Sequence, residues 1–203
     1  MTRAEFWVSV GSTYSYLTVL RLPAIEAATG IEFDWRPFSV REIMVEMDNV
    51  PFVKKPVKAA YMWRDIGRRA AMYGLAPKLP ASYPLQEFDR ANRVAILARA
   101  QGWCRDYMVE TYRRWFECAE PAGGDPNLRG TLSTLGKDPD EIVAESGTEA
   151  VGAAYRAATE EARRLGIFGV PSFRVDGELF WGDDRLEDAL SWLRTGRVSP
   201  RQE

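Results

Sequence analysis

The stretch IFGVPSF, residues 167–173, decides the fold of this chain. It follows a charged helical run that ends at Gly166, and it leads into a strand-like segment from Phe173 to Phe180. Pro171 interrupts an apolar run where a strand begins, a position that tolerates proline because no ladder hydrogen bond is lost there. Such a proline is either an ordinary strand-entry residue or a cis-proline that makes a sharp turn. The rest of the chain has to distinguish the two.

The size and composition of the chain limit what it can be. Its 203 residues are enough for one large domain, or for a domain with a sizeable insertion. The formal net charge is −2 with both signs interspersed, so no basic surface for nucleic acid is expected. No apolar run approaches the roughly eighteen residues of a membrane span, and residues 1–10 are too short and too acidic for a signal peptide. We therefore expect a cytoplasmic protein without a membrane or nucleic-acid partner.

Two residue counts narrow the chemistry. The chain has no histidine, which excludes Ser-His-Asp and Cys-His nucleophile pairs and every His-ligated metal site. Its two cysteines, Cys104 and Cys118, have neither a CxxC redox spacing nor a metal-binding spacing. We expect each to be a buried small hydrophobic residue, and we expect no metal site. The nucleophile or redox centre of an enzyme with this sequence would therefore be borrowed from a cofactor.

The first part of the chain predicts a β-α-β unit. Phe6–Val10 is predicted to be a buried strand, Ser12–Thr29 a helix that ends at Gly30, and Ile31–Pro37 a second strand. The helix is long enough to cross between two parallel strands.

The middle of the chain, residues 41–165, carries little strand signal and several helical runs. Glycine follows the end of most of these runs, and Asp138-Pro139-Asp140-Glu141 has the pattern of a capping box. The predicted helices are Pro56–Tyr73, Gln86–Gln101, Trp103–Glu120, Asp138–Gly147 and Thr148–Leu165.

The pattern returns to strands at the C-terminal end. Ser172–Val175 and Glu178–Trp181 flank Asp176-Gly177, which is a strong signal for a two-residue hairpin turn. Asp184 has the position of an N-cap residue in a second capping box, which would begin a final helix to about Arg194.

The order β-α-β, helical block, β-β-α is the layout of an α/β protein with a thioredoxin-like fold and a large all-helical insertion. We expect residues 1–40 and 167–203 to form the thioredoxin-like domain. Residues 41–166 are expected to form the inserted helical domain.

Four stretches, in the right order along the chain, resemble the kappa-class glutathione transferases and the 2-hydroxychromene-2-carboxylate isomerases. Each motif alone is weak, but the set is specific and covers essentially the whole chain. The stretches are Gly11-Ser12-Thr13-Tyr14-Ser15-Tyr16-Leu17; Asn49 with Lys58, Tyr61-Met62 and Asp65; Phe168-Gly169-Val170-Pro171; and Trp181-Gly182-Asp183-Asp184-Arg185-Leu186.

Three positions depart from the pattern of that family. The family often has an acidic residue three before its serine and a proline directly after it, whereas Ser9 and Thr13 stand at these positions here. Asp183 stands where asparagine or serine is usual. This places an extra negative charge beside the expected glutathione site, where it could weaken binding of the γ-glutamyl carboxylate.

Ser12 is the candidate catalytic residue. Its ordinary role would be that of a helix N-cap, with the hydroxyl accepting a hydrogen bond from a free backbone N–H. The resemblance implies that this serine activates the sulfur of glutathione, and a helix N-terminus favours an anion at this place. A hydroxyl that donates to a bound thiolate would lower the thiol pKa from its free value of about 8.5.

The resemblance also implies a set of glutathione-binding residues, each with an ordinary structural alternative. Asn49 would meet the tripeptide, although it can equally satisfy its own turn. Lys58 would reach a carboxylate, although it can equally belong to a solvated basic helix face. Val170, before Pro171, would offer its backbone N–H and C=O to the cysteine of glutathione, as an added strand does. Asp184, besides its capping role, would hold the γ-glutamyl ammonium next to Asp183.

Tyr14 and Trp181 could line the pocket for an aromatic substrate, with packing in the core as the alternative. For an isomerase, the resemblance implies that the glutathione thiolate adds to the conjugated carbon of the ring-opened substrate. The former double bond then rotates as a single bond, and elimination of the thiol leaves the trans isomer.

The leading functional hypothesis is a glutathione-dependent isomerase of aromatic catabolism that acts on 2-hydroxychromene-2-carboxylate or a related compound. A kappa-like transferase that conjugates electrophiles uses the same residues, and a non-catalytic glutathione-binding or small-molecule-binding protein is a third reading. A DsbA-like thiol-disulfide oxidoreductase needs a CxxC where Gly11-Ser12-Thr13-Tyr14 stands, and is excluded. The resemblance further implies a homodimer.

Overall fold

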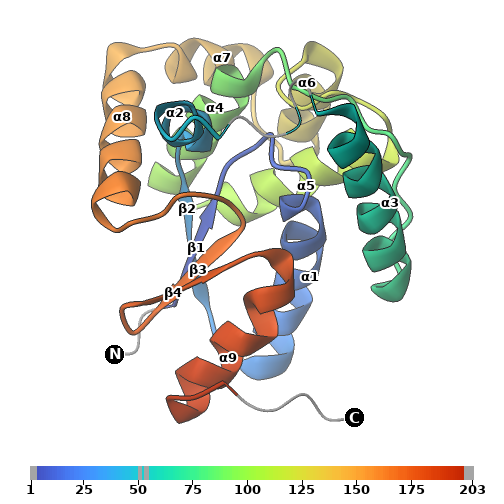
Figure 1. Cartoon of the computed structure of the whole chain (residues 1–203). Helices are drawn as coiled ribbons and strands as arrows, with labels where there is room; N and C mark the ends of the chain where they lie inside the picture. Colours follow the sequence, from blue (N-terminus) through green and yellow to red (C-terminus); the bar gives the residue numbers. More distant parts are fainter. Residues whose placement is uncertain (1–3, 50–51, 53–54, 199–203) are drawn as a thin grey trace.

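The fold is centred on a four-stranded mixed sheet. The computed structural model describes residues 4–49, 52 and 55–198. The strand order is β2-β1-β3-β4, in which β1 and β2 are parallel and the other two pairs are antiparallel. In Figure 1, α1 and α9 lie on one side of this sheet and α8 lies on the other. The bounds are β1 Ala4–Val8, α1 Ser15–Thr29, β2 Phe33–Pro37, β3 Ser172–Val175, β4 Glu178–Trp181 and α9 Leu186–Thr195.

Seven helices of the described chain lie between β2 and β3, where the helical insertion was predicted. The thioredoxin-like α/β fold with a helical insertion is therefore confirmed, while the domain boundaries at residues 40/41 and 166/167 stay a prediction. Within the described residues no helix is both long and apolar enough to cross a membrane. The seven helices are α2 Val40–Glu46, α3 Pro56–Met72, α4 Phe88–Ala100, α5 Cys104–Glu117, α6 Asp125–Thr134, α7 Pro139–Ser146 and α8 Glu149–Arg164.

Two of these helices were not predicted. The helix α2 begins after Ser39, whose hydroxyl accepts a hydrogen bond from the backbone N–H of Glu42. Ser39 and Glu42 have the spacing of a capping box, which is a signal that sequence reasoning could have used. The helix α6 follows directly after Pro121–Gly124, a segment that predicts only the end of α5, and it carries a proline in its first turn.

The first strand ends two residues before its predicted end, because a side chain replaces the neighbouring strand. Val10 donates its backbone N–H to Asn92 Oδ1 (2.8 Å), and its carbonyl accepts from Asn92 Nδ2 (2.9 Å). Both backbone groups of Val10 are thereby satisfied outside the sheet. Asn92 is fully buried in α4, so the inserted helices terminate β1.

The C-terminal half confirms the predicted hairpin and corrects one predicted cap. Asp176 and Gly177 both have positive φ (49° and 91°), as the tightest hairpin turns require. The capping box at Asp138 is confirmed, since its carboxylate accepts from the N–H groups of Asp140 and Glu141. The N-cap role of Asp184 is wrong, because a 3₁₀ turn at Asp183–Arg185 precedes α9 and leaves that helix without a side-chain cap.

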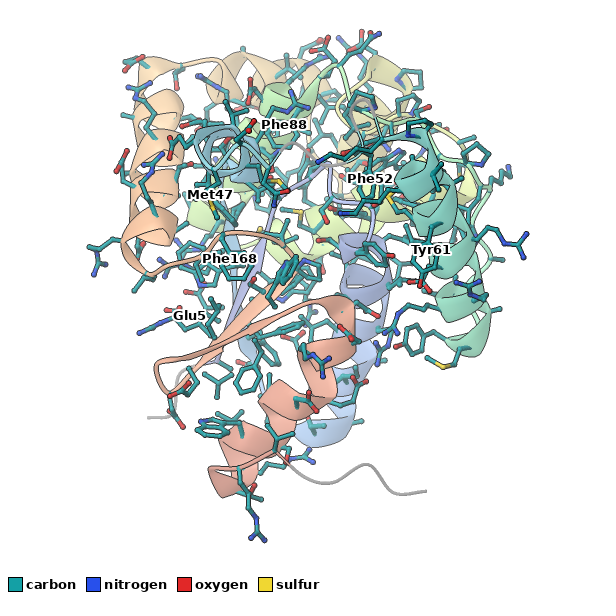
Figure 2. The ribbon with its side chains drawn as sticks, in the orientation of Figure 1. Glu5, Met47, Phe52, Tyr61, Phe88 and Phe168 are labelled. Atoms are coloured by element: carbon teal, nitrogen blue, oxygen red, sulfur yellow. The ribbon has the colours of Figure 1, made fainter. Side chains whose placement is uncertain are left out.

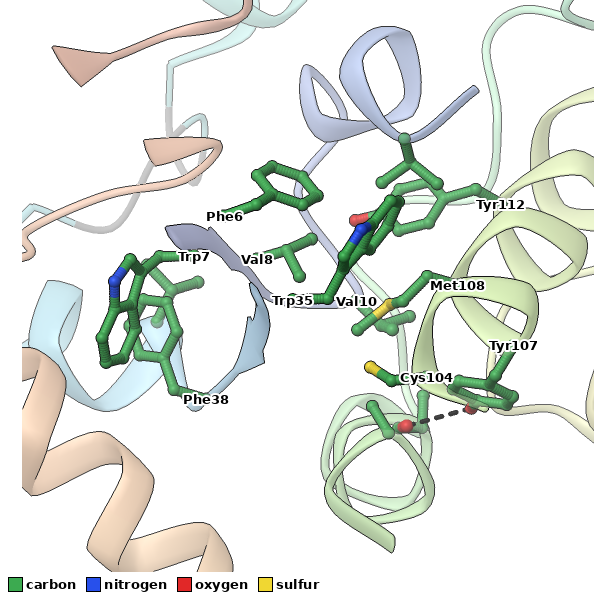
Figure 3. Packing of buried hydrophobic residues seen from close by; sticks show 14 of the residues in the cluster. Phe6, Trp7, Val8, Val10, Trp35, Phe38, Cys104, Tyr107, Met108 and Tyr112 are labelled. Carbon is green, nitrogen blue, oxygen red and sulfur yellow. Dashed lines mark hydrogen bonds between the residues drawn. The ribbon is translucent and has the colours of Figure 1, made fainter. Parts of the chain in front are cut away.

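Aromatic residues on both faces of the sheet make up much of the core, part of which Figure 3 shows. Phe6 stacks on Phe173 with ring centroids 5.5 Å apart, and it meets the edge of Trp35 at 4.8 Å. Burial of one such side chain stabilises the fold by about 1.5–3 kcal/mol. Cys104 packs in this core as predicted, but Cys118 is exposed at the end of α5, so the prediction that both cysteines are buried is wrong for Cys118.

Candidate functional site

A pocket of about 310 Å³ lies where the C-terminal loops meet α1 and α3. Six of the predicted site residues line it: Tyr14, Val170, Pro171, Trp181, Asp183 and Asp184. Tyr14 and Trp181 both line the pocket: Trp181 keeps 53% of its surface exposed, whereas Tyr14 is half-buried and also packs against the core. Four further residues complete the lining: Tyr61, Asp65, Arg69 and Gly182.

Ser12, in the turn that leads into α1, is not among the lining residues, but it borders the pocket through its contact with Val170. Its hydroxyl donates to the carbonyl of Val170 at 3.2 Å, although 158 positions separate the two residues in the sequence. The same oxygen accepts a weak hydrogen bond from the backbone N–H of Ser15 at 3.4 Å. Ser12 is half-buried, and its hydroxyl therefore makes both a contact typical of an N-cap and a contact to the proline loop.

Two side chains of the inserted helices fix the backbone around Ser12. The hydroxyl of Tyr112 lies 2.9 Å from the carbonyl of Ser9 and 3.2 Å from that of Ser12, and it can donate to either. Asn92 accepts from the hydroxyl of Ser9 (3.2 Å) in addition to its two bonds with Val10. Both Tyr112 and Asn92 are fully buried, so hydrogen bonds from the inserted helices α5 and α4 fix the backbone of this turn.

The proline loop, residues 168–171, contributes Val170 and Pro171 to the pocket lining. The Val170–Pro171 peptide bond is cis, and the carbonyl of Pro171 accepts from the N–H of Gly182 at 2.9 Å. The backbone N–H of Val170 has no hydrogen-bond partner anywhere in the described chain. Gly169 lies directly against Trp181, since a Cβ on this glycine would stand 2.6 Å from the indole nitrogen.

Asp183 is a buried carboxylate with several donors around it, and its side chain is only 1% exposed. One oxygen accepts from the hydroxyl of Thr18 (3.1 Å) and from Arg21 (3.3 Å). The other oxygen accepts from the Nε (3.1 Å) and Nη2 (2.6 Å) of Arg69, and the hydroxyl of Tyr73 lies 3.4 Å away. The extra negative charge that the sequence places beside the site is thus paired with two arginines instead of facing the pocket alone.

Two other carboxylates face the pocket more openly. Asp184 has a side chain that is 45% exposed and pairs with Arg185 at 3.3 Å. Asp65 accepts a hydrogen bond from the hydroxyl of Tyr14 at 3.0 Å and a second one from Arg68. Burial and this bond to Asp65 raise the pKa of the Tyr14 phenol well above its ordinary value of 10, so Tyr14 is a neutral donor.

Asn49 and Lys58 do not line the pocket. Both are exposed: Asn49 follows α2, with its backbone N–H bonded to the carbonyl of Met44, and Lys58 lies in the first turn of α3. Their predicted contacts with glutathione stay predictions. In Figure 2, Tyr61 marks the side of α3 that reaches the pocket.

Sequence reasoning missed Arg69, although a signal was present. Tyr61, Asp65 and Arg69 recur every four residues on α3, and this spacing places them on one face of a helix. All three line the pocket. Asn92 and Tyr112 were missed because no local pattern shows which distant loop a buried polar residue will contact. Among the residues described, no group of three or more Cys, Asp or Glu could hold a metal ion.

The chain has the features of a thioredoxin-like fold with a helical insertion. These are the mixed sheet with this strand order, the helices inserted after β2 and the cis-proline before β3. The chain belongs to the family of DsbA-like thioredoxin domains, which it matches over residues 3–194.

Among curated proteins, the chain is 29% identical to a 2-hydroxychromene-2-carboxylate isomerase of Sphingobium xenophagum over 191 residues, which cover 93% of this chain and 96% of the relative. It is 24% identical to glutathione S-transferase kappa 2 of Caenorhabditis elegans, over 98% of this chain and 95% of that protein. A solved 2-hydroxychromene-2-carboxylate isomerase shares its fold with a TM-score of 0.83 at 23% identity, covering 95% and 96% of the two chains.

Proposed function

We propose that this chain is a glutathione-dependent isomerase that interconverts 2-hydroxychromene-2-carboxylate, or a related aromatic compound, and its trans-o-hydroxybenzylidenepyruvate form. The observation that carries the proposal is the 3.2 Å hydrogen bond between Ser12 and the cis-proline loop at the edge of the pocket. Relatives named as this isomerase match the chain over nine-tenths or more of its length, which supports the same reaction class.

The residues around the pocket fit glutathione. Val170 has an unpaired N–H before the cis-proline, where a peptide backbone could add as a short strand. Asp184 and Arg69 also line the pocket, where they could supply an acceptor and a donor for the charged end of a peptide. Bound glutathione would supply the thiol nucleophile that the chain itself lacks, because Cys104 and Cys118 are not among the pocket residues.

Ser12 would hold the sulfur of the cofactor in its anionic form. Its hydroxyl, which donates to the carbonyl of Val170 here, would donate to the sulfur instead. The backbone N–H groups of Thr13 and Tyr14, directly before α1, have no partner within the described residues. Free N–H groups at a helix N-terminus stabilise an anion. These donors favour the thiolate over the thiol and so lower the thiol pKa.

Tyr14 and Trp181 would hold the aromatic substrate. Both line the pocket, and the neutral phenol of Tyr14 is kept in place by Asp65. Aromatic side chains bury a planar ligand well because they offer a large, rigid apolar surface. We further propose a homodimer, as the resemblance implies, and a cytoplasmic location, as the composition of the chain predicts.

A kappa-like transferase is the second candidate, and the match to glutathione S-transferase kappa 2 favours it. The products separate the two activities, because a transferase accumulates a glutathione conjugate whereas an isomerase returns free glutathione. A non-catalytic binding protein would show neither outcome.

The test is calorimetric titration of reduced glutathione into the wild-type protein, Ser12→Ala and the control Ser133→Ala, with thiolate absorbance recorded in parallel. Ser133 is exposed on α6 and its side chain makes no hydrogen bond to any described residue, so its variant should behave as wild type. We expect glutathione binding by all three proteins, with the thiolate signal lost in Ser12→Ala alone. No binding to the wild type at millimolar glutathione would contradict the proposal.

A further inference from the structure

Arg69 is the arginine of the pocket, and only part of its guanidinium is used inside the protein. Its Nε and Nη2 contact Asp183, and Nη2 also donates to the hydroxyl of Tyr73 at 2.9 Å. Its Nη1 makes no hydrogen bond or ion pair with any residue that the structure describes. The side chain is 24% exposed and lines the pocket, so two N–H donors remain for a ligand.

Asp183 does not need the whole of Arg69 for its own neutralisation. Thr18 and Arg21 already satisfy one carboxylate oxygen, and Tyr73 lies against the other. Asp183 instead fixes the orientation of the Arg69 guanidinium, because two of its N–H groups donate to one carboxylate oxygen that is buried. Burial acts to lower the pKa of Arg69, but the bond to Asp183 raises it overall, so this arginine stays charged.

A pre-positioned arginine with unused donors is a strong receptor for a carboxylate, since charge-assisted hydrogen bonds of the guanidinium are short and directional. The pocket also contains Asp184, an exposed acceptor-only group, on the same loop as Asp183. Together they offer one cationic donor and one anionic acceptor to a ligand.

We propose that Arg69 binds a carboxylate of the ligand in this pocket, and that Asp183 is the positioning residue that holds Arg69 for this task. This inference rests on the proposed function, because the ligands that would bring the carboxylate are glutathione and the substrate. Asp183 then contributes to ligand binding through Arg69 instead of repelling the γ-glutamyl carboxylate.

The test pairs a protein change with a ligand change. The affinities of wild type, Arg69→Gln and Asp183→Asn are measured for reduced glutathione and for γ-aminobutyryl-cysteinyl-glycine, which lacks only the α-carboxylate of the γ-glutamyl residue. KM and kcat for 2-hydroxychromene-2-carboxylate are measured at saturating glutathione. Arg64→Gln is the matched control, since Arg64 lies on the same helix, is exposed and its side chain makes no hydrogen bond or ion pair with the described residues.

We expect Arg69→Gln to weaken glutathione binding by about 10- to 100-fold, as for the loss of a hydrogen bond between charged groups, and to leave the affinity for the analogue nearly unchanged. Asp183→Asn should reduce in part the preference for glutathione over the analogue. A merely structural role of Asp183 would lower both affinities alike. Arg69→Lys keeps the charge and serves if Arg69→Gln does not fold.

If glutathione affinity stays and KM for the substrate rises in Arg69→Gln, the inference holds with the substrate carboxylate as the bound group. The inference is overturned if Arg69→Gln changes neither the glutathione affinity nor the substrate KM, while the wild type binds glutathione and turns over the substrate. The proposed function then stands. A wild type that neither binds glutathione nor turns over the substrate contradicts both.

Discussion

Asn92 shows how much one buried side chain contributes to the site. Its amide group bonds both backbone groups of Val10, the carbonyl of Phe88 and the hydroxyl of Ser9. Asn92→Ala would leave the N–H and C=O of Val10 buried without partners. We expect the free energy of unfolding to fall by about 2–4 kcal/mol, measured by urea denaturation. A loss below about 1 kcal/mol would mean that water replaces the amide.

The two cysteines, Cys104 and Cys118, are expected to differ in reactivity. Burial raises the pKa of the Cys104 thiol to about 12, whereas Cys118 is exposed. Only the thiolate reacts with a disulfide reagent. We expect one thiol per chain to react quickly with such a reagent at pH 8 in the native protein, and the second only after unfolding. The variant Cys118→Ala should abolish the fast phase, and a fast phase that persists would contradict the assignment.

Capping residues allow a prediction at the scale of a single element. Asp138 and Asp184 each begin a sequence that looks like a capping box, yet only Asp138 bonds the N–H groups of the following turn. We therefore expect Asp138→Ala to lower the free energy of unfolding by about 1 kcal/mol. Asp184→Ala should change it by less than about 0.5 kcal/mol. Equal losses in the two variants would show that α9 is capped in solution.

The comparison of Asp138 with Asp184 also explains how far local patterns predict elements. Strand alternation and the Asp176-Gly177 turn predict the hairpin to the residue, because both signals are local. The end of β1 and the cap of α9 were missed because they depend on contacts with distant residues or on a 3₁₀ turn. The capping box of α2 was local and present, so that helix could have been predicted.

At the scale of the whole molecule, the insertion supports the site as well as adding to it. The inserted helices provide Asn92 and Tyr112 under the turn that holds Ser12, and they provide the pocket face of α3. The sequence predicts the residues that the chain brings to the pocket near Ser12 and Pro171. The spacing of Tyr61, Asp65 and Arg69 places Arg69 on the pocket face of α3, but its pairing with Asp183 could not be predicted, because it joins positions 114 residues apart.

Buried tyrosines link the stability of the whole molecule to pH. Tyr107 and Tyr112 are fully buried, and burial raises the pKa of each phenol above its ordinary value of 10. The folded state therefore keeps these protons at a pH where the unfolded chain has lost them. Because the unfolded state then binds fewer protons, the free energy of unfolding decreases as the pH rises above about 10, and the full contribution is present below that pH.

We expect urea midpoints to be constant from neutral pH to about pH 8 and to begin to fall above about pH 8.5, because the pKa of the buried Cys104 thiol is also raised, to about 12. Above about pH 10 they should fall steeply, with tyrosinate absorbance from the buried rings appearing only on unfolding. Tyr107→Phe keeps the ring and loses the hydrogen bond to the carbonyl of Ala91, which costs about 1 kcal/mol at neutral pH. The same variant should show a shallower decline above pH 10, because it carries one buried phenol fewer. Identical slopes for wild type and Tyr107→Phe, or full tyrosinate absorbance in a protein that is still folded, would contradict this account, since both outcomes require the buried phenols to titrate as exposed ones do.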